Sequence, residues 1–237
     1  MMQALWDQAA GDLYGPKESP VADPVVWEHS ARVARLTATL AAMPELAHHV
    51  LDRTALTAAA LYHDAGWLLD VWDGRIDPSL LLLKRTSDEQ RDRAAAWMGT
   101  RLADVLEPGC LRLAARVVVA CNDRDTRLLE SQILADAENL DLVGPQALWF
   151  MVRRQLAEQR TLDEMVDAWQ RQQQYGYWPV WIKESLRFAS SQQLAEQRWK
   201  AMARYMDDLR RCCAPADGHD PAHGSAADRA ALLTVSR

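Results

Sequence analysis

Apolar residues recur at helical spacing along most of the chain. After Asp23-Pro24, a pair typical of a helix start, one face carries Val26, His29, Val33, Leu36 and Leu40. Asp52 is a plausible cap for a second main helix, whose inner face carries Leu56, Ala59, Ala60 and His63. Gly66 is expected to end or loosen this helix. The pattern therefore predicts two successive helices, each with a histidine on its apolar face.

Further helices are predicted downstream, separated by breaks that contain proline, glycine or charged residues. They span about 87–106, 111–121, 130–140, 147–156, 161–173 and 179–211, and residues 70–86 form a loop with one short helical turn. Ser87 with Gln90 and Thr161 with Glu164 fit capping boxes. The one β-branched run, Val117 to Val119, lies inside a helical pattern. The sequence therefore predicts an all-α protein.

The organisation expected from this pattern has four parts. Residues 1–22 form an N-terminal segment, 23–146 the core helices, 147–213 C-terminal helices packed on the core, and 214–237 a flexible tail rich in small and polar residues.

Composition and charge exclude several classes of partner. Apolar residues make up 49% and charged residues 25%, and the net charge is -6 with a pI near 5.5. This balance argues against extended nucleic acid and anionic membrane surfaces as partners, although a local basic pocket for phosphate remains open. The sequence has no apolar stretch long enough to span a membrane and no signal-peptide pattern at its N-terminus. Its four cysteines are expected to be free thiols, so we expect a cytoplasmic protein.

Three polar residues occupy positions where apolar ones are expected, and a fourth follows one of them. His29 and His63 lie on apolar faces, Asp64 follows directly, and Asp136 interrupts the apolar run from Ile133 to Leu140. Burying an imidazole or a carboxylate without a partner costs on the order of a few kcal/mol. A shared metal ion would satisfy such groups together, and hydrogen-bonded core histidines are the alternative.

The order His29, His63-Asp64 and Asp136 resembles the H…HD…D signature of the HD superfamily. The flanks are similar as well: Ala58 to Gly66 around the dipeptide, Asp136 to Asp141 followed by Gly144, and Leu194 to Arg198 followed by Met202. The resemblance covers roughly residues 20–211. It implies an HD-domain helical bundle with a C-terminal helical extension.

The resemblance also implies a chemistry. His29, His63, Asp64 and Asp136 would hold one divalent metal ion, for which Mn, Fe, Co, Ni, Zn and Mg all remain open. The activity would be hydrolysis of a phosphate ester of a small molecule or nucleotide, with Asp64 as ligand and as acceptor of the water proton.

The sequence departs from the family pattern at two points. No histidine lies between His63 and Asp136, so a second metal would rely on Cys121, Asp123 or water. This favours a single metal and argues against the iron oxygenases of the superfamily. Where hydrolytic relatives often have Lys or Glu, this chain has Trp67 to Asp70, which leaves Asp70 as a stand-in general acid or base. A non-catalytic HD module that binds metal or nucleotide for regulation is the alternative.

Several further residues are candidates for binding and support. Arg32, Lys84, Arg85, Arg124 and Arg127 are expected to contact phosphate, or else to be solvated surface charges. Trp27 and Trp67 could wall a nucleobase pocket. Glu130 and Asp141 are expected to play supporting or structural roles rather than to be ligands. His48-His49 and the second dipeptide His219-Asp220, with His223, are not expected to bind metal.

Overall fold

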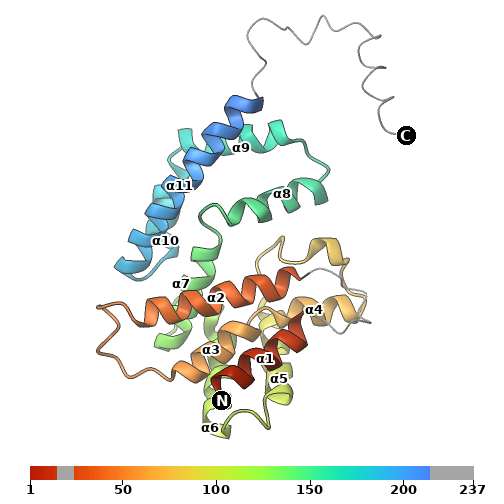
Figure 1. Cartoon of the computed structure of the whole chain (residues 1–237), viewed down its shortest axis with the longest axis vertical. Helices are drawn as coiled ribbons and strands as arrows, with labels where there is room; N and C mark the ends of the chain where they lie inside the picture. The colour runs from red at the N-terminus through yellow and green to blue at the C-terminus, as the bar shows by residue number, and fades with distance from the viewer. Residues whose placement is uncertain (15–23, 214–237) are drawn as a thin grey trace, which may run out of the picture.

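The computed structural model describes residues 1–14 and 24–213, and within these ranges it contains helices and no strands, which confirms the all-α prediction (Figure 1). The α-helices are α1 (Met2–Leu13), α2 (Val25–Ala41), α3 (Arg53–Tyr62), α4 (Ala65–Trp72), α5 (Asp88–Arg101), α6 (Pro108–Val119), α7 (Leu129–Asp141), α8 (Ala147–Ala157), α9 (Leu162–Gln174), α10 (Tyr177–Ser185) and α11 (Ala189–Cys213). Two short 3-10 helices, η1 (Pro78–Leu80) and η2 (Ala120–Asn122), join them. The expected cap Asp23, the expected tail 214–237 and the His219-Asp220 dipeptide with His223 lie outside the described residues.

Local side-chain caps start the helices where the sequence indicates. The Asp52 carboxylate accepts hydrogen bonds from the amides of Thr54 and Ala55 at 3.1 and 2.9 Å. Both predicted capping boxes are present, at Ser87 with Gln90 and at Thr161 with Glu164. Each cap satisfies amides that the first helical turn leaves without a partner, so these three starts are encoded locally.

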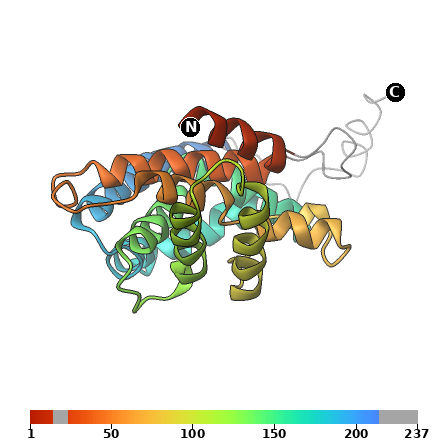
Figure 2. The ribbon, with the colours of Figure 1, turned by 90° about the horizontal axis from the view of Figure 1, so that it is seen from below.

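The main hydrophobic core lies among α1 to α7, with α2, α3 and α7 packed against one another. Helix α1, expected only as an N-terminal segment, buries Leu5, Ala9 and Leu13 in this core and lies along α2 (Figure 2). Its Asp12 accepts a 2.6 Å hydrogen bond from the Tyr62 hydroxyl. The N-terminal segment is therefore an integral part of the core.

A second, smaller apolar cluster joins the C-terminal helices, which are labelled α8 to α11 in Figure 1. It consists of Val143, Ala147, Leu148, Met165, Val166, Trp169, Trp178, Met202 and Met206. Ile182 of α10, Leu186 just after it and Ala195 of α11 also belong to the main core. This shared packing holds the C-terminal helices against α7.

The helix predicted over about 87–106 ends at Arg101, and two further differences from the prediction bear on the site. The expected helix 179–211 is interrupted between Ser185 and Ala189, where the amides of Arg187 and Phe188 donate to the Asp136 carboxylate at 3.0 to 3.1 Å. The side-chain amide of Asn139 also donates to the carbonyl oxygen of Ser185 at 3.0 Å. Tertiary hydrogen bonds from α7 therefore fix a break that the apolar pattern of the segment does not reveal.

The second difference concerns the helix that carries His63. Helix α3 ends at Tyr62 and α4 begins at Ala65, so His63 and Asp64 lie in the turn between two helices. Gly66 thus lies at the start of α4 rather than at the end of α3.

No helix in the described part of the chain has the length and apolarity needed to cross a membrane.

Gly66 allows α4 and α5 to approach closely, which yields a first testable prediction. A β-carbon at Gly66 would lie 2.8 Å from the carbonyl carbon of Gln90 and closer still to its oxygen. We expect Gly66→Ala to lower the free energy of unfolding by roughly 1–3 kcal/mol, as overpacking does. Chemical denaturation measures this change.

Gly99 provides a matched control because it lies within α5 with open space around it. Gly99→Ala is expected to be neutral or stabilising by up to about 1 kcal/mol, since alanine is the better helix former. Equal losses of stability in the two variants would contradict the proposed close contact.

Candidate metal centre

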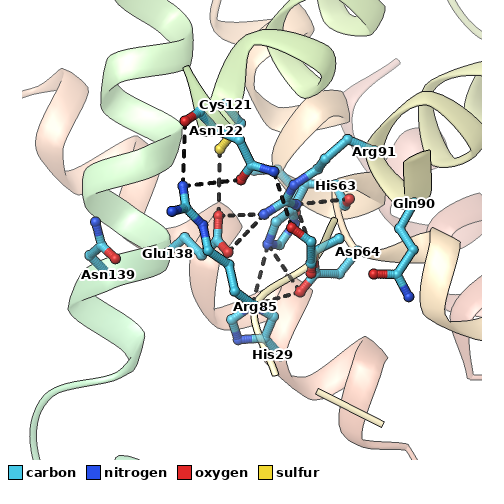
Figure 3. Close-up of polar contacts among 12 residues, drawn as sticks. His29, His63, Asp64, Arg85, Gln90, Arg91, Cys121, Asn122, Glu138 and Asn139 are labelled. Atoms are coloured by element: carbon cyan, nitrogen blue, oxygen red, sulfur yellow. Dashed lines mark hydrogen bonds and ion pairs between the residues drawn. The ribbon is translucent and has the colours of Figure 1, made fainter. Parts of the chain in front are cut away.

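Three predicted ligands meet in the core. The Nε2 atoms of His29 and His63 lie 3.2 Å apart, and the Asp64 Oδ2 atom lies 3.3 and 3.6 Å from them (Figure 3). His29 comes from the second turn of α2, and the other two come from the turn between α3 and α4. All three side chains are buried.

The remaining ring nitrogens fix the direction of the imidazoles. The Nδ1 atom of His29 lies 2.8 Å from Asp141 Oδ2, and Nδ1 of His63 lies 2.8 Å from the Ala60 carbonyl oxygen. A carbonyl oxygen only accepts, so His63 donates from Nδ1 and turns the Nε2 lone pair toward His29 and Asp64. The centre thus gathers acceptor atoms that need a shared cation or proton.

This donor set fits a transition-metal ion. Two ligand atoms about 2.1 Å from one ion, at bond angles near 90–110°, are separated by roughly 3.0–3.4 Å. The three pairwise separations of 3.2, 3.3 and 3.6 Å lie close to that range. Mixed nitrogen and oxygen donors suit several divalent metals, so the centre does not choose one.

The second oxygen of Asp64 is held from outside the cluster. Asp64 Oδ1 accepts hydrogen bonds from the Thr86 hydroxyl at 2.6 Å and from the Arg91 guanidinium at 2.8 Å. Thr86 in turn accepts from the Trp67 indole at 2.8 Å. These bonds direct Oδ2 toward the histidines, and Trp67 therefore supports Asp64.

Arg91 is a site residue that the sequence reasoning missed. Its guanidinium also donates to the His63 carbonyl oxygen at 2.9 Å and to both carboxylate oxygens of Glu138 at 2.7 Å (Figure 3). The run Asp88 to Arg93 is highly charged, and such a run usually predicts a solvated helix face. The sequence pattern around Arg91 therefore predicts a surface residue and not a buried one.

The structure does not bring Asp136 to the cluster, in contrast to the expectation. Both of its carboxylate oxygens accept backbone amides from the break between α10 and α11. Two residues along a helix correspond to a rotation of about 200°, so Asp136 and Glu138 point in nearly opposite directions. Ala135, Glu138 and Asn139 of α7, with Leu142 directly after it, line a cavity beside His29 and Asp64. That i, i+3, i+4, i+7 spacing is the signal that could have selected Glu138.

Asp70 also lies outside the cavity. Its carboxylate accepts a 2.8 Å hydrogen bond from Gln90 and pairs with Arg93. It does not line the cavity at His29 and Asp64. The position suits a role in joining α4 to α5, so the structure does not place Asp70 at the cavity, where a general acid or base is expected.

A cavity of about 390 Å³ opens beside His29 and Asp64. Five cationic side chains line it: Lys84, Arg85, Arg124, Arg154 and Arg187. Of these, Arg154 and Arg187 were not identified from the sequence because they lie far along the chain, on α8 and in the α10–α11 break. Two aromatic side chains, Phe150 and Trp181, complete the wall.

Two predicted phosphate contacts lie elsewhere. Arg32 makes two hydrogen bonds to the Asp141 carboxylate, at 2.8 and 3.0 Å, and so helps to fix the partner of His29. Arg127 lines a separate shallow surface pocket with Val119 and Leu128. Trp27 packs against Trp6, with ring centroids 6.0 Å apart, so the cavity takes its aromatic wall from other helices.

The remaining residues singled out in the sequence do not belong to the His29, His63 and Asp64 cluster. Glu130 lies 3.4 Å from the amide of Asp52 at the start of α3. Asp141 supports His29, as expected, and His48 and His49 are exposed on the connection between α2 and α3.

Burial and neighbouring charges shift the pKa values of the three side chains in the centre. Burial alone would lower the pKa of His29, but Asp141 and Asp64 outweigh it and raise that pKa to about 9. Burial lowers the pKa of His63. Burial would raise the pKa of Asp64, yet the neighbouring His63, Arg91 and His29 hold it well below its ordinary value. In the metal-free protein a proton on His29 therefore balances the acceptor cluster.

Metal binding is consequently expected to depend on pH, because a metal ion must displace the proton from His29. Below pH 9 His29 keeps this proton until the metal binds and releases it, so the apparent dissociation constant for Mn²⁺ should fall by roughly tenfold per unit increase in pH. Titration of the metal-free protein between about pH 6 and 8 measures the slope. Asp141→Asn removes one group that raises the pKa and should flatten the dependence. An affinity that is constant over this range in the wild type would contradict the assigned proton.

Thr86 gives a second prediction at the centre. Thr86→Val removes the hydroxyl between Trp67 and Asp64 with little change in shape. We expect the metal affinity to fall by roughly 10–100-fold, as it does when a partner of a ligand is lost. Thr39→Val, at an exposed position on α2, should leave the affinity unchanged. Equal affinities in both variants would show that Thr86 does not orient Asp64.

Comparisons with known proteins support the fold. No family model matches the sequence, and a search of curated proteins finds no match. Among solved structures, Bacillus subtilis YpgQ in complex with ADP is 18% identical, with a TM-score of 0.55 over 91% of this chain and 99% of that one. A predicted HD superfamily hydrolase from an uncultured Thermotogales bacterium is 14% identical, with a TM-score of 0.53 over 89% and 91% of the two chains.

The fold is therefore that of HD-domain proteins. The likeness spans nearly the whole of each neighbour, and the chain places a His-His-Asp cluster in its core. At this level of identity the likeness establishes the architecture, while the chemistry depends on the residues of this chain.

Proposed function

We propose that the protein is a metal-dependent phosphohydrolase acting on a phosphate ester of a small molecule or nucleotide. One observation carries the proposal: a converging His-His-Asp donor set opens onto a cavity lined by five cationic side chains. The chain as a whole has a net charge of -6, so this concentration of positive charge is local. It complements an anionic ligand beside a cation site.

His29, His63 and Asp64 would hold the divalent metal. In place of Asp136, Glu138 supplies the α7 carboxylate that faces the cavity. A divalent metal at such donors withdraws charge from a phosphoryl oxygen and makes water more acidic. Asp64 stays ionised because its pKa is held low, so it can accept a hydrogen bond from the attacking water.

The cavity lining supports a nucleotide or a molecule of similar size. Its volume of about 390 Å³ is within the usual range for small-molecule sites. Arg85, Arg154 and Arg187 can pair with phosphate oxygens, and Phe150 and Trp181 offer faces for a ring. The structural neighbour YpgQ was solved in complex with ADP, which supports nucleotides as the first ligands to test.

The test is turnover by the full chain loaded with Mn²⁺. Release of phosphate or pyrophosphate is measured with phosphate monoesters and with nucleoside mono-, di- and triphosphates. Hydrolysis of at least one substrate by the wild type, lost in His63→Ala and kept in His48→Ala, would support the proposal. No hydrolysis with any divalent metal would contradict it.

A regulatory binding module is the second candidate. Arg91 contacts both oxygens of Glu138 and one oxygen of Asp64, so the carboxylates nearest the cluster are already engaged. This engagement favours ligand binding without proton transfer. Binding of ADP without turnover of any substrate would favour the module over the enzyme.

A further inference from the structure

The centre contains a permanent positive charge of its own. Arg91 has no exposed surface and is the largest fully buried side chain in the described part of the chain. Arginine stays protonated under all physiological conditions, and its burial requires paired charges. Its guanidinium lies between the carboxylates of Asp64 and Glu138, at 2.8 and 2.7 Å.

The two carboxylate oxygens of Asp64 face different groups. Oδ2 faces the Nε2 atoms of His29 and His63, whereas Oδ1 faces Arg91. A carboxylate that divides its oxygens in this way can bridge two neighbouring cations. In this chain the guanidinium fills the position on the Oδ1 side.

The groups around Arg91 have the chemistry of metal ligands. Beyond Asp64 Oδ1, they include both oxygens of Glu138, and the Cys121 thiol lies 3.5 Å from Glu138 Oε2. Two carboxylates and a thiol would attract a divalent ion if no cation were already present. Arg91 neutralises the carboxylates and occupies the space among them.

We propose that Arg91 is a built-in cation that takes the place of a second metal ion and restricts the centre to one divalent metal per chain. The inference rests on the proposed function to the extent that His29, His63 and Asp64 must hold the first metal. It assigns Arg91 as the residue that sets metal stoichiometry. It also explains how the chain keeps a bridging aspartate without extra histidines to support a second ion.

The consequence is testable by counting metal ions. Wild-type protein titrated with Mn²⁺ should saturate at one ion per chain, even at high Mn²⁺ concentration. Arg91→Met removes the charge while keeping a long apolar side chain, and it should bind a second Mn²⁺ beside Asp64 and Glu138. Magnetic coupling between two Mn²⁺ ions, seen by electron paramagnetic resonance, would report their proximity independently of activity.

Two further variants keep the test decisive if Arg91→Met does not fold. Arg91→Gln retains hydrogen-bond donors without the charge and should also gain the second ion. Arg91→Lys retains the charge and should stay at one. Two coupled Mn²⁺ ions in the wild type would overturn the inference, as would a folded, uncharged variant that still binds only one.

The failure of the proposed function would look different. A wild type that binds no Mn²⁺ would overturn the metal centre itself, together with the role of Arg91 there. A wild type that binds one Mn²⁺ but hydrolyses no phosphate ester would contradict the enzyme proposal and leave the stoichiometry result standing.

Discussion

Asp64→Asn is expected to remove hydrolysis and metal binding together. Asp64 gives Oδ2 to the histidine cluster and Oδ1 to Thr86 and Arg91. Asparagine replaces one oxygen with an amide group and removes the charge that balances the cation. Metal assistance contributes several kcal/mol to such reactions, so kcat/KM should fall by at least about 10³-fold. Steady-state kinetics and metal content measured on the same preparation test both effects.

Asp73→Asn is the matched control for this substitution. Asp73 follows α4, its side chain is half exposed, and it pairs with Arg93 at the surface. The change in charge is the same, but we expect activity and metal content to match the wild type. A folded Asp64→Asn protein with normal turnover would refute the assignment of Asp64.

Arg91→Met is expected to have the largest effect on stability. In the metal-free protein it leaves the buried Asp64 and the partly buried Glu138 without their shared cation. Removing one partner of a buried ion pair destabilises proteins by about 3–5 kcal/mol. Urea unfolding of the metal-free variant should show this loss, and added Mn²⁺ should recover part of it by binding only the folded state.

Arg75→Met makes the same substitution at the surface. The Arg75 side chain is 53% exposed and pairs with Asp70, Asp73 and Glu89. Exposed ion pairs contribute little, so we expect a change below about 1 kcal/mol. If both variants lost the same amount of stability, Arg91 could not be the buried counterion of the centre.

The fold was predictable because most of its signals are local. The apolar stripe of α2 and the side-chain caps at Asp52, Ser87 and Thr161 each act within a few residues, and the structure confirms them. The break between α10 and α11 was not predictable in this way, since Asp136 and Asn139 of α7 hold it by hydrogen bonds across more than forty residues.

The site was predictable only in part for a similar reason. His29 and His63 lie on apolar faces, which alone leaves hydrogen-bonded core histidines as an alternative, and the order of His29, His63 and Asp64 resembles the HD signature. Choosing between Asp136 and Glu138 required the rotation of α7 relative to the cavity, which depends on packing. Arg91 lies in a charged run that normally predicts exposure, and only the tertiary pairing with Asp64 and Glu138 explains its burial.

The metal content of the purified protein decides whether His29, His63 and Asp64 hold a metal ion. Elemental mass spectrometry should be applied to wild type, His63→Ala and His48→Ala after identical incubation with Mn²⁺, Ni²⁺ or Fe²⁺. His48 is the control because it is an exposed histidine outside the centre. About one ion per chain is expected in the wild type and in His48→Ala, and almost none in His63→Ala. A folded wild type without metal, or a His63→Ala protein that retains it, would show that His29, His63 and Asp64 do not form the metal site.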